Sequence, residues 1–148
     1  FSTSGGNIGI GFAIPVNTAK RVVADILTRG YVVYAYLGTE TQTLTPAVAR
    51  VLELSVGQGA IIVRIAKGSP AARAGLQGGT RQVIIGNAIV VIGGDIVTAA
   101  DGVKIQTSEA LRRMTRKHQP GEIMKLEILR QGKRMEVDVK LAEQPRQG

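Results

Sequence analysis

Turns that contain glycine or proline divide this chain into short apolar segments. Val and Ile are frequent in these segments, as is typical of strands. Five of the turns lie in the second half of the sequence, at Gly86-Asn87, Gly93-Gly94, Asp101-Gly102, Pro120-Gly121 and Gln131-Gly132. We therefore expect an α+β fold that is mainly β: a small, strongly curved antiparallel sheet, or partly open barrel, capped by two short helices.

The composition defines the material of the core and excludes several kinds of chemistry. Hydrophobic residues form 44% of the 148 residues but aromatic residues only 3%, so the core must consist of Val, Ile, Leu and Ala. The absence of cysteine excludes disulfides, thiol catalysis and cysteine-bound zinc. No uncharged apolar stretch reaches the length of about 18 residues that a transmembrane helix needs.

Residues 1–30 are expected to form an appendage to the main domain. Apolar residues alternate with small ones from Ile8 to Ile14, which predicts a strand. After Pro15, one apolar face between Val22 and Leu27 predicts a helix of about three turns. The chain begins at Phe1 without an initiator methionine, so we expect it to be a piece of a longer protein.

Residues 31–142 are expected to form the main domain, and residues 143–148 a frayed tail. Capping residues and prolines predict short helices that start at Thr45-Pro46, at Ser69-Pro70 and at Thr107 or Ser108. The segments expected to be strands are 32–37, 60–65, 83–85, 88–92, 95–99, 123–129 and 135–141.

The segment Tyr36-Leu37-Gly38-Thr39 is the strongest candidate for a binding site. A glycine between apolar residues and the start of a strand can turn backbone N–H groups toward a bound carboxylate. Taken alone, the four residues are equally typical of an ordinary strand that ends in a turn. The neighbouring motifs decide between these two interpretations.

Two groups of motifs resemble one protein family. The first consists of Gly68-Ser69-Pro70-Ala71, Ala74-Gly75-Leu76, Gly94-Asp95-Ile96-Val97, Asp101-Gly102 and the Ala110-Leu111 helix, and it resembles the bacterial PDZ domain. The second, from Gly5 to Pro15, resembles the closing strand of the trypsin-like protease domain in HtrA/Deg serine proteases. In that family the protease domain leads through a helix into the PDZ domain, which is the order seen here.

This resemblance implies that the amides of Leu37, Gly38 and Thr39 hold the C-terminal carboxylate of a peptide. The peptide would add as an extra strand to the edge that follows. The peptide-binding residues implied in this way are Tyr36, Leu37, Gly38, Thr39, Glu40, Thr41, Thr107 and Leu111. Leu37, Thr39 and the groove side of the helix would form a pocket for a small or medium apolar terminal residue.

The chain departs from the family pattern in two places. Family members often carry a basic residue two positions before the loop tyrosine, where this chain has Tyr34. We therefore expect the carboxylate to be held chiefly through backbone amides. Residues 77–93 exceed the usual turn length, and Gly86-Asn87 predicts that they contain an inserted hairpin.

We expect no catalytic residues, no metal site and no cofactor. Ser4-Gly5-Gly6 is similar to the nucleophile motif of trypsin-like proteases, but the residues from Asn7 to Phe12 match the strand that follows that motif. The only histidine, His118, is expected to cap a helix end or to face solvent. The carboxylates are too scattered for a metal site, and the glycine-rich turns lack the lysine and spacing of a phosphate loop.

The family resemblance implies a peptide-binding module of an exported serine endopeptidase in protein quality control, located in the bacterial periplasm or cell envelope. The implied partners are peptide or protein C-termini, unfolded protein substrates, the protease domain and further copies of the chain. An assembly module of the same protease, which does not select peptides, is an alternative.

Nucleic-acid binding is a second alternative, because the formal charge is +8. The basic residues gather on the helix near Arg112 and on the strands at the end of the domain. No aromatic side chains interleave them to stack on bases, so we expect a solvated basic surface and no nucleic-acid partner.

Overall fold

The computed structural model describes residues 33–145 of the chain. The chain separates into two units, Phe1–Val33 and Tyr34–Gly148, and the second holds the domain described below. The strand and helix expected within residues 1–30 lie outside the described residues. None of the helices between residues 33 and 145 has the length and hydrophobicity of a transmembrane segment.

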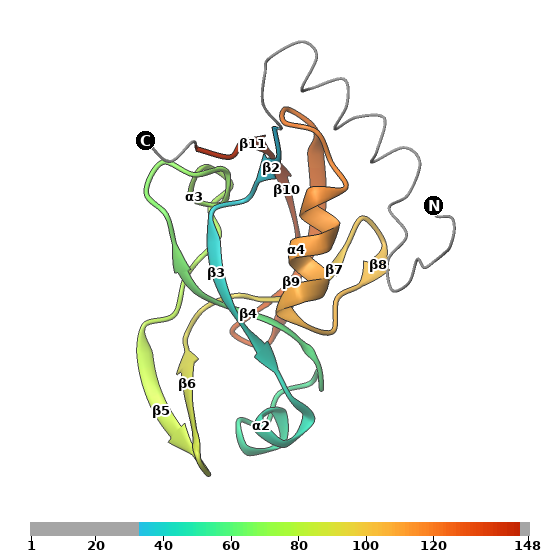
Figure 1. Cartoon of the computed structure of the whole chain (residues 1–148). Coiled ribbons are helices and arrows are strands. Elements are labelled where there is room, and N and C mark those ends of the chain that lie inside the picture. Colours follow the sequence, from blue (N-terminus) through green and yellow to red (C-terminus); the bar gives the residue numbers. More distant parts are fainter. Residues whose placement is uncertain (1–32, 146–148) are drawn as a thin grey trace, which may run out of the picture. The chain divides into compact units, whose positions relative to one another are not determined.

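A six-stranded antiparallel sheet forms the framework of the domain (Figure 1). Its main path runs through β10 (Lys133–Lys140), β9 (Ile123–Arg130), β7 (Ile96–Ala100), β4 (Gly59–Ile65) and β3 (Thr39–Leu44). The sixth strand, β8 (Val103–Lys104), pairs with β7. This architecture confirms the expected mainly-β, antiparallel fold, and it leaves β3 at an edge of the sheet.

Two pairs of strands and three short helices complete the described part of the chain. The strand pairs are β5 (Arg81–Ile85) with β6 (Ala88–Ile92), and β2 (Ala35–Tyr36) with β11 (Ala142–Glu143). The helices are α2 (Pro46–Val51), α3 (Pro70–Arg73) and α4 (Ser108–Arg116). Their N-caps are Thr45, Ser69 and Thr107, whose hydroxyl oxygens accept hydrogen bonds from amides three residues later.

The ends of the domain are paired with each other more extensively than the sequence indicates. The strand expected over residues 32–37 is reduced to the two residues of β2. Its partner β11 reaches Glu143, one residue into the tail that was expected to fray. The amide of Gln144 also donates to the carbonyl of Tyr34 at 2.9 Å. This pairing connects residues about 110 positions apart, so no local pattern reveals it.

Two apolar clusters lie on opposite faces of the sheet. Side chains alternate between the faces of a strand, and β4 places Ala60 and Ile62 in one cluster and Ile61 in the other. The larger cluster is covered by α4 through Leu111. The smaller cluster includes Leu44 and Ala49 and is completed by the β5–β6 hairpin, which contributes the buried Val90.

The hairpin expected within residues 77–93 is present and has a structural role. Ile85 pairs with Ala88 across Gly86-Asn87, and the φ angle of Gly86 is 61°. Gln42 of β3 holds the hairpin: its Nε2 donates to the carbonyl of Ile89 at 2.7 Å, and its Oε1 accepts from the amide of Val91 at 3.2 Å. The insertion therefore covers one face of the sheet.

Candidate functional site

A groove of about 440 Å³ lies between β3 and α4, with the loop before β3 at one end. Figure 1 shows α4 running alongside β2 and β3. The residues that line the groove are Ala35, Tyr36, Leu37, Gly38, Thr39, Glu40, Thr41, Ser108, Leu111, Arg112, Thr115, Arg116 and Gln144. One wall is therefore a strand edge, and the other is the face of a helix.

Gly38 gives the loop a shape that no other residue could adopt there without strain. Its φ angle is 89°, in the left-handed region that favours glycine. A Cβ atom at this position would collide with Cβ and Oγ of Ser69. The serine is itself fixed, because it is the N-cap of α3 and accepts a hydrogen bond from Ala72. The Gly-Ser-Pro motif thus lies directly beneath the loop.

Two backbone hydrogen bonds fix the orientation of the loop. The carbonyl of Leu37 accepts from the amide of Ala71 at 2.9 Å, and the carbonyl of Gly38 accepts from the amide of Ala66 at 2.9 Å. In a trans peptide the N–H group points opposite to the carbonyl of the preceding residue. The N–H groups of Gly38 and Thr39 therefore point away from α3 and β4, toward the open side of the loop.

The edge of β3 continues this open arrangement. Within the described part of the chain, β3 pairs with β4 on one side and with no strand on the other. Its register places Glu40 opposite Arg64 and Thr41 opposite Ile62, so the additional residue of the bulge, Val63, belongs to β4. The strand β3 keeps its alternation, and the N–H group of Thr41 points to the same open side as that of Thr39.

The α4 wall is attached to β3 at the start of the helix. The amide of Ser108 donates to Oγ1 of Thr43 at 3.0 Å. One turn and two turns later, Leu111 and Thr115 are buried on the side that faces the groove. The hydroxyl of Ser108 is buried and has no hydrogen-bond partner among the described residues. A polar ligand in the groove could supply one.

The charges around the groove are unevenly distributed. Arg112 and Arg116 contribute two cations from α4, whereas Glu40 contributes one anion from β3. The carboxylate of Glu40 lies 3.2 Å from the guanidinium of Arg64 on the neighbouring strand β4, and both side chains are exposed. The α4 wall is therefore positively charged and favours an anionic ligand.

The groove contains most of the residues expected from the sequence. Those that line it are Tyr36, Leu37, Gly38, Thr39, Glu40, Thr41 and Leu111. The eighth, Thr107, is not among the lining residues, because its hydroxyl caps α4 by accepting from the amide of Ala110 at 3.0 Å.

Six further residues line the groove that were not expected from the sequence. These are Ala35, Ser108, Arg112, Thr115, Arg116 and Gln144. The spacing of Ser108, Arg112 and Thr115 matches one helix face and could have indicated three of them. Gln144 reaches the groove through the pairing of β11 with β2, for which the sequence has no local signal.

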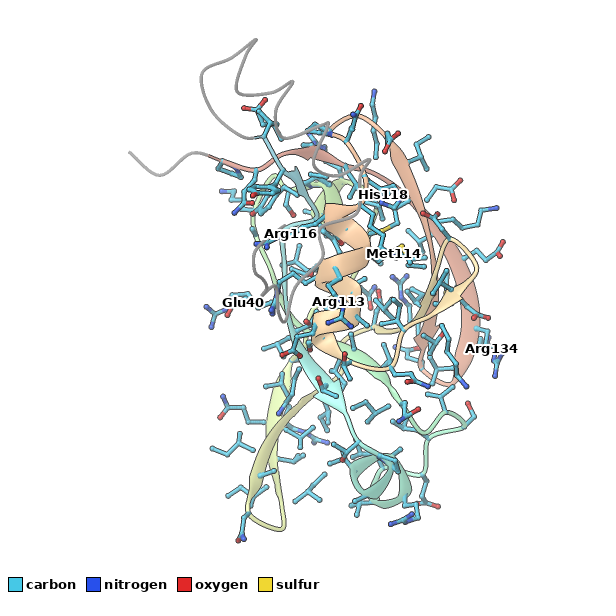
Figure 2. The ribbon with its side chains drawn as sticks, turned by 45° about the vertical axis from the view of Figure 1, so that its right-hand side comes forward. Glu40, Arg113, Met114, Arg116, His118 and Arg134 are labelled. Carbon is cyan, nitrogen blue, oxygen red and sulfur yellow. The ribbon has the colours of Figure 1, made fainter. Side chains whose placement is uncertain are left out.

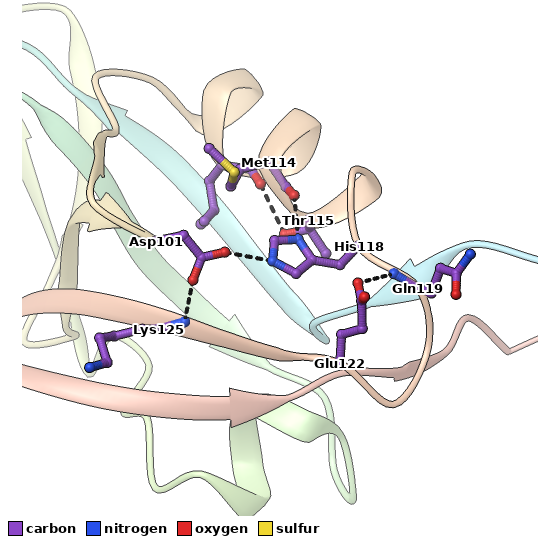
Figure 3. Close-up of polar contacts among 8 residues, drawn as sticks. Asp101, Met114, Thr115, His118, Gln119, Glu122 and Lys125 are labelled. Atoms are coloured by element: carbon purple, nitrogen blue, oxygen red, sulfur yellow. Dashed lines mark hydrogen bonds and ion pairs between the residues drawn. The ribbon is translucent and has the colours of Figure 1, made fainter. Parts of the chain in front are cut away.

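His118 has a structural position at the end of α4 (Figure 3). Its Nδ1 lies 2.9 Å from the carbonyl oxygen of Met114, and its Nε2 lies 2.6 Å from Oδ2 of Asp101. The other carboxylate oxygen of Asp101 accepts from the amide of Lys125 at 2.9 Å. These contacts connect the helix end to the β7–β8 turn and to β9.

The described residues bear on metal binding but not on the serine considered as a nucleophile. Ser4, the candidate nucleophile that the sequence interpretation rejected, lies outside them. Between residues 33 and 145, no three His, Asp or Glu side chains are grouped so that they could hold a metal ion.

Comparison with known proteins identifies the family of the domain. A family model described as "PDZ domain" matches residues 35–141. A probable periplasmic serine endoprotease, DegP-like, from Brucella suis is 34% identical over 145 residues. Its counterpart from Chlamydia trachomatis is 35% identical over 144 residues. The alignments include 98% and 97% of this chain, but the chain spans only about a quarter of the length of these relatives, 25% and 26%.

Solved structures give the same result. The HtrA-type protease AlgW with a decapeptide is 28% identical, with a TM-score of 0.65 over 99% of this chain and 41% of that chain. The HtrA3 PDZ domain bound to a phage-derived ligand is 21% identical, with a TM-score of 0.56 over 76% of this chain and 88% of that chain, and it shows the shared fold. This chain belongs to the PDZ domain family, and its domain is homologous to the PDZ region of HtrA/DegP-like serine proteases.

Proposed function

We propose that this domain binds peptides by their C-terminal ends, in the groove between β3 and α4. The N–H groups of Gly38 and Thr39 hold the terminal carboxylate, and the peptide backbone pairs with the open edge of β3. The terminal side chain lies among Leu37, Leu111 and Thr115. A small or medium apolar residue suits this space.

The observation that carries this proposal is the orientation of the loop. The carbonyl of Leu37 accepts a hydrogen bond from α3, and the carbonyl of Gly38 accepts one from the residue after β4. The amides of Gly38 and Thr39 therefore point outward. A strand edge begins immediately after these amides and extends for six residues. This combination provides donors for a carboxylate next to a strand that can accept one more partner.

The relatives support the same class of ligand. AlgW, an HtrA-type protease, has been solved with a decapeptide and with a tripeptide. By homology, we infer that the domain serves a trypsin-like serine endopeptidase of the periplasm or cell envelope. There it binds C-termini or extended segments of unfolded substrates and regulates the protease domain.

Titration with matched peptides tests the proposal. Short peptides that end in Val, Ala or Leu are prepared as free acids and as C-terminal amides, and binding to the 148-residue chain is followed by calorimetry. Anchoring of one side chain and strand addition predict affinity on the order of micromolar for the free acids. Amides are expected to bind at least tenfold more weakly. Equal affinity for the free acid and the amide would show that the loop does not bind the terminal carboxylate.

Light scattering of the same samples distinguishes peptide binding from an assembly role of the groove. If the groove docks onto another copy of the chain, light scattering will show oligomers that dissociate when a free-acid peptide is added. A monomer that binds the peptide supports ligand selection.

A further inference from the structure

The guanidinium group of Arg116 lies over the aromatic ring of Tyr34, with 5.2 Å between its central carbon and the ring centroid. Arginine prefers such a position, because its flat, weakly hydrated cation is attracted to the face of an aromatic ring. Tyr34 is 41% exposed and Arg116 is exposed as well, so the stacked pair lies at the surface of the domain. The pair thus holds a positive charge in a defined place.

That place is the loop end of the groove. Tyr34 immediately precedes β2, which leads into the loop at Leu37. Arg116 is the last residue of α4 and lines the groove. Figure 2 shows Arg116 on the side of α4 that faces β3, whereas Met114 points to the opposite side. The cation of Arg116 and the outward amides of Gly38 and Thr39 therefore occupy the same end.

The groove contains two other charged side chains, and neither replaces Arg116. Arg112 lies one helical turn earlier on α4, toward the end of the groove where Ser108 meets Thr43. Glu40 is an anion that already lies beside Arg64. The loop itself, from Tyr36 to Thr39, contains no basic residue. Arg116 is therefore the cation best placed for a carboxylate bound at the loop.

We propose that Arg116 forms a charge-assisted contact with the terminal carboxylate of the bound peptide, and that stacking on Tyr34 positions it. This role rests on the proposed function of the groove. It implies that the domain supplies the charge from the end of α4, although Tyr34 occupies the position where family members often carry a basic residue. The carboxylate would be held by backbone amides and one cation together.

The test compares two peptides against four forms of the 148-residue chain. The peptides share one sequence and end in a free carboxylate or an amide. The proteins are the unchanged chain, Arg116→Gln, Arg116→Lys and the control Arg113→Gln. Arg113 lies on the same helix but does not line the groove, so this control loses the same charge elsewhere. Thermal unfolding shows that each variant is folded.

Arg116→Gln is expected to weaken binding of the free acid about three- to tenfold and to leave binding of the amide unchanged. Arg116→Lys is expected to keep part of the preference for the free acid, and Arg113→Gln all of it. The loss of affinity for the free acid in Arg116→Gln is also expected to become smaller as the salt concentration is raised.

The outcomes separate this role from the function on which it rests. If the unchanged chain binds neither peptide, the proposed function fails. If it prefers the free acid and Arg116→Gln retains the full preference, the amides alone hold the carboxylate and the role of Arg116 is wrong. If Arg116→Gln weakens binding of the free acid and of the amide equally, the proposed contact with the carboxylate is also wrong, because that result indicates a packing role.

Discussion

The carboxylate of Asp95 and the guanidinium of Arg130 form a two-point ion pair inside the domain. Nε of Arg130 donates to one carboxylate oxygen at 2.8 Å, and one terminal nitrogen donates to the other at 2.7 Å. Asp95 is 1% exposed. The hydrogen bonds to Asp95 raise the pKa of Arg130 above its usual value. The same guanidinium donates to the carbonyl of Gly75, so the pair connects β7 and β9 to the end of α3.

Replacement of Arg130 is expected to destabilise the domain strongly. Arg130→Met leaves the carboxylate of Asp95 buried with the amide of Gln77 as its remaining donor. A buried charge that loses its partner costs about 3 kcal/mol or more. Arg134→Met is the matched control, because Arg134 is exposed and lies 3.7 Å from Glu127. Urea unfolding of both variants measures the difference. Equal stability of the two variants would contradict the structural role of the pair.

Substitution of Gly38 is expected to cause both backbone strain and a steric clash, whereas substitution of Gly68 causes backbone strain alone. Gly38→Ala forces alanine into a left-handed backbone conformation and also places a methyl group against Ser69. Gly68 has a φ angle of 73°, but its Cβ would meet open space. Gly68→Ala is expected to cost about 1 kcal/mol, and Gly38→Ala clearly more, with loss of peptide binding. The measurements are chemical denaturation and peptide titration. Retained peptide binding in Gly38→Ala would show that the loop is not the carboxylate site.

Thr41→Pro tests strand addition at the edge of β3. The N–H group of Thr41 points to the open side, so proline removes a donor for the peptide without breaking a hydrogen bond to β4. We expect peptide affinity to fall about tenfold. Thr41→Val keeps the amide and serves as the control in the same titration. Unchanged affinity in a folded Thr41→Pro variant would show that the peptide does not pair at this position.

Gln42 is expected to control the opening of the inserted hairpin. Gln42→Leu removes both hydrogen bonds to β6, which are worth about 0.5–1.5 kcal/mol each. Gln42→Glu keeps an oxygen that can accept from Val91 but loses the donor to Ile89. Hydrogen exchange at the amide of Val91 is expected to accelerate in Gln42→Leu and to change less in Gln42→Glu. Slow exchange in both variants would show that the apolar contacts of Val90 hold the hairpin without Gln42.

Elements whose causes are local could be predicted from the sequence. Two residues with turn geometry between apolar-containing segments were sufficient for the β5–β6 hairpin and for the β9–β10 hairpin, which turns at Gln131-Gly132. Ser69 and Pro70 defined the start of α3, and the start of α4 was predicted at Thr107 or Ser108, of which Thr107 is the N-cap. The loop at Gly38 was also recognisable, because a glycine before a strand permits a positive φ angle.

Contacts between residues that are distant in the sequence could not be predicted in this way. Three such contacts join residues that are 35 or more positions apart: Arg116 with Tyr34, Gln42 with Val91, and Arg130 with Asp95. Thr107 shows the same limit, because the family resemblance implied a position in the groove, whereas its hydroxyl caps α4. Such contacts depend on sheet order and on the way each helix packs, and these follow from burial summed over the whole domain. The sequence thus located the loop, and the packing of α4 beside β2 placed a charge next to it.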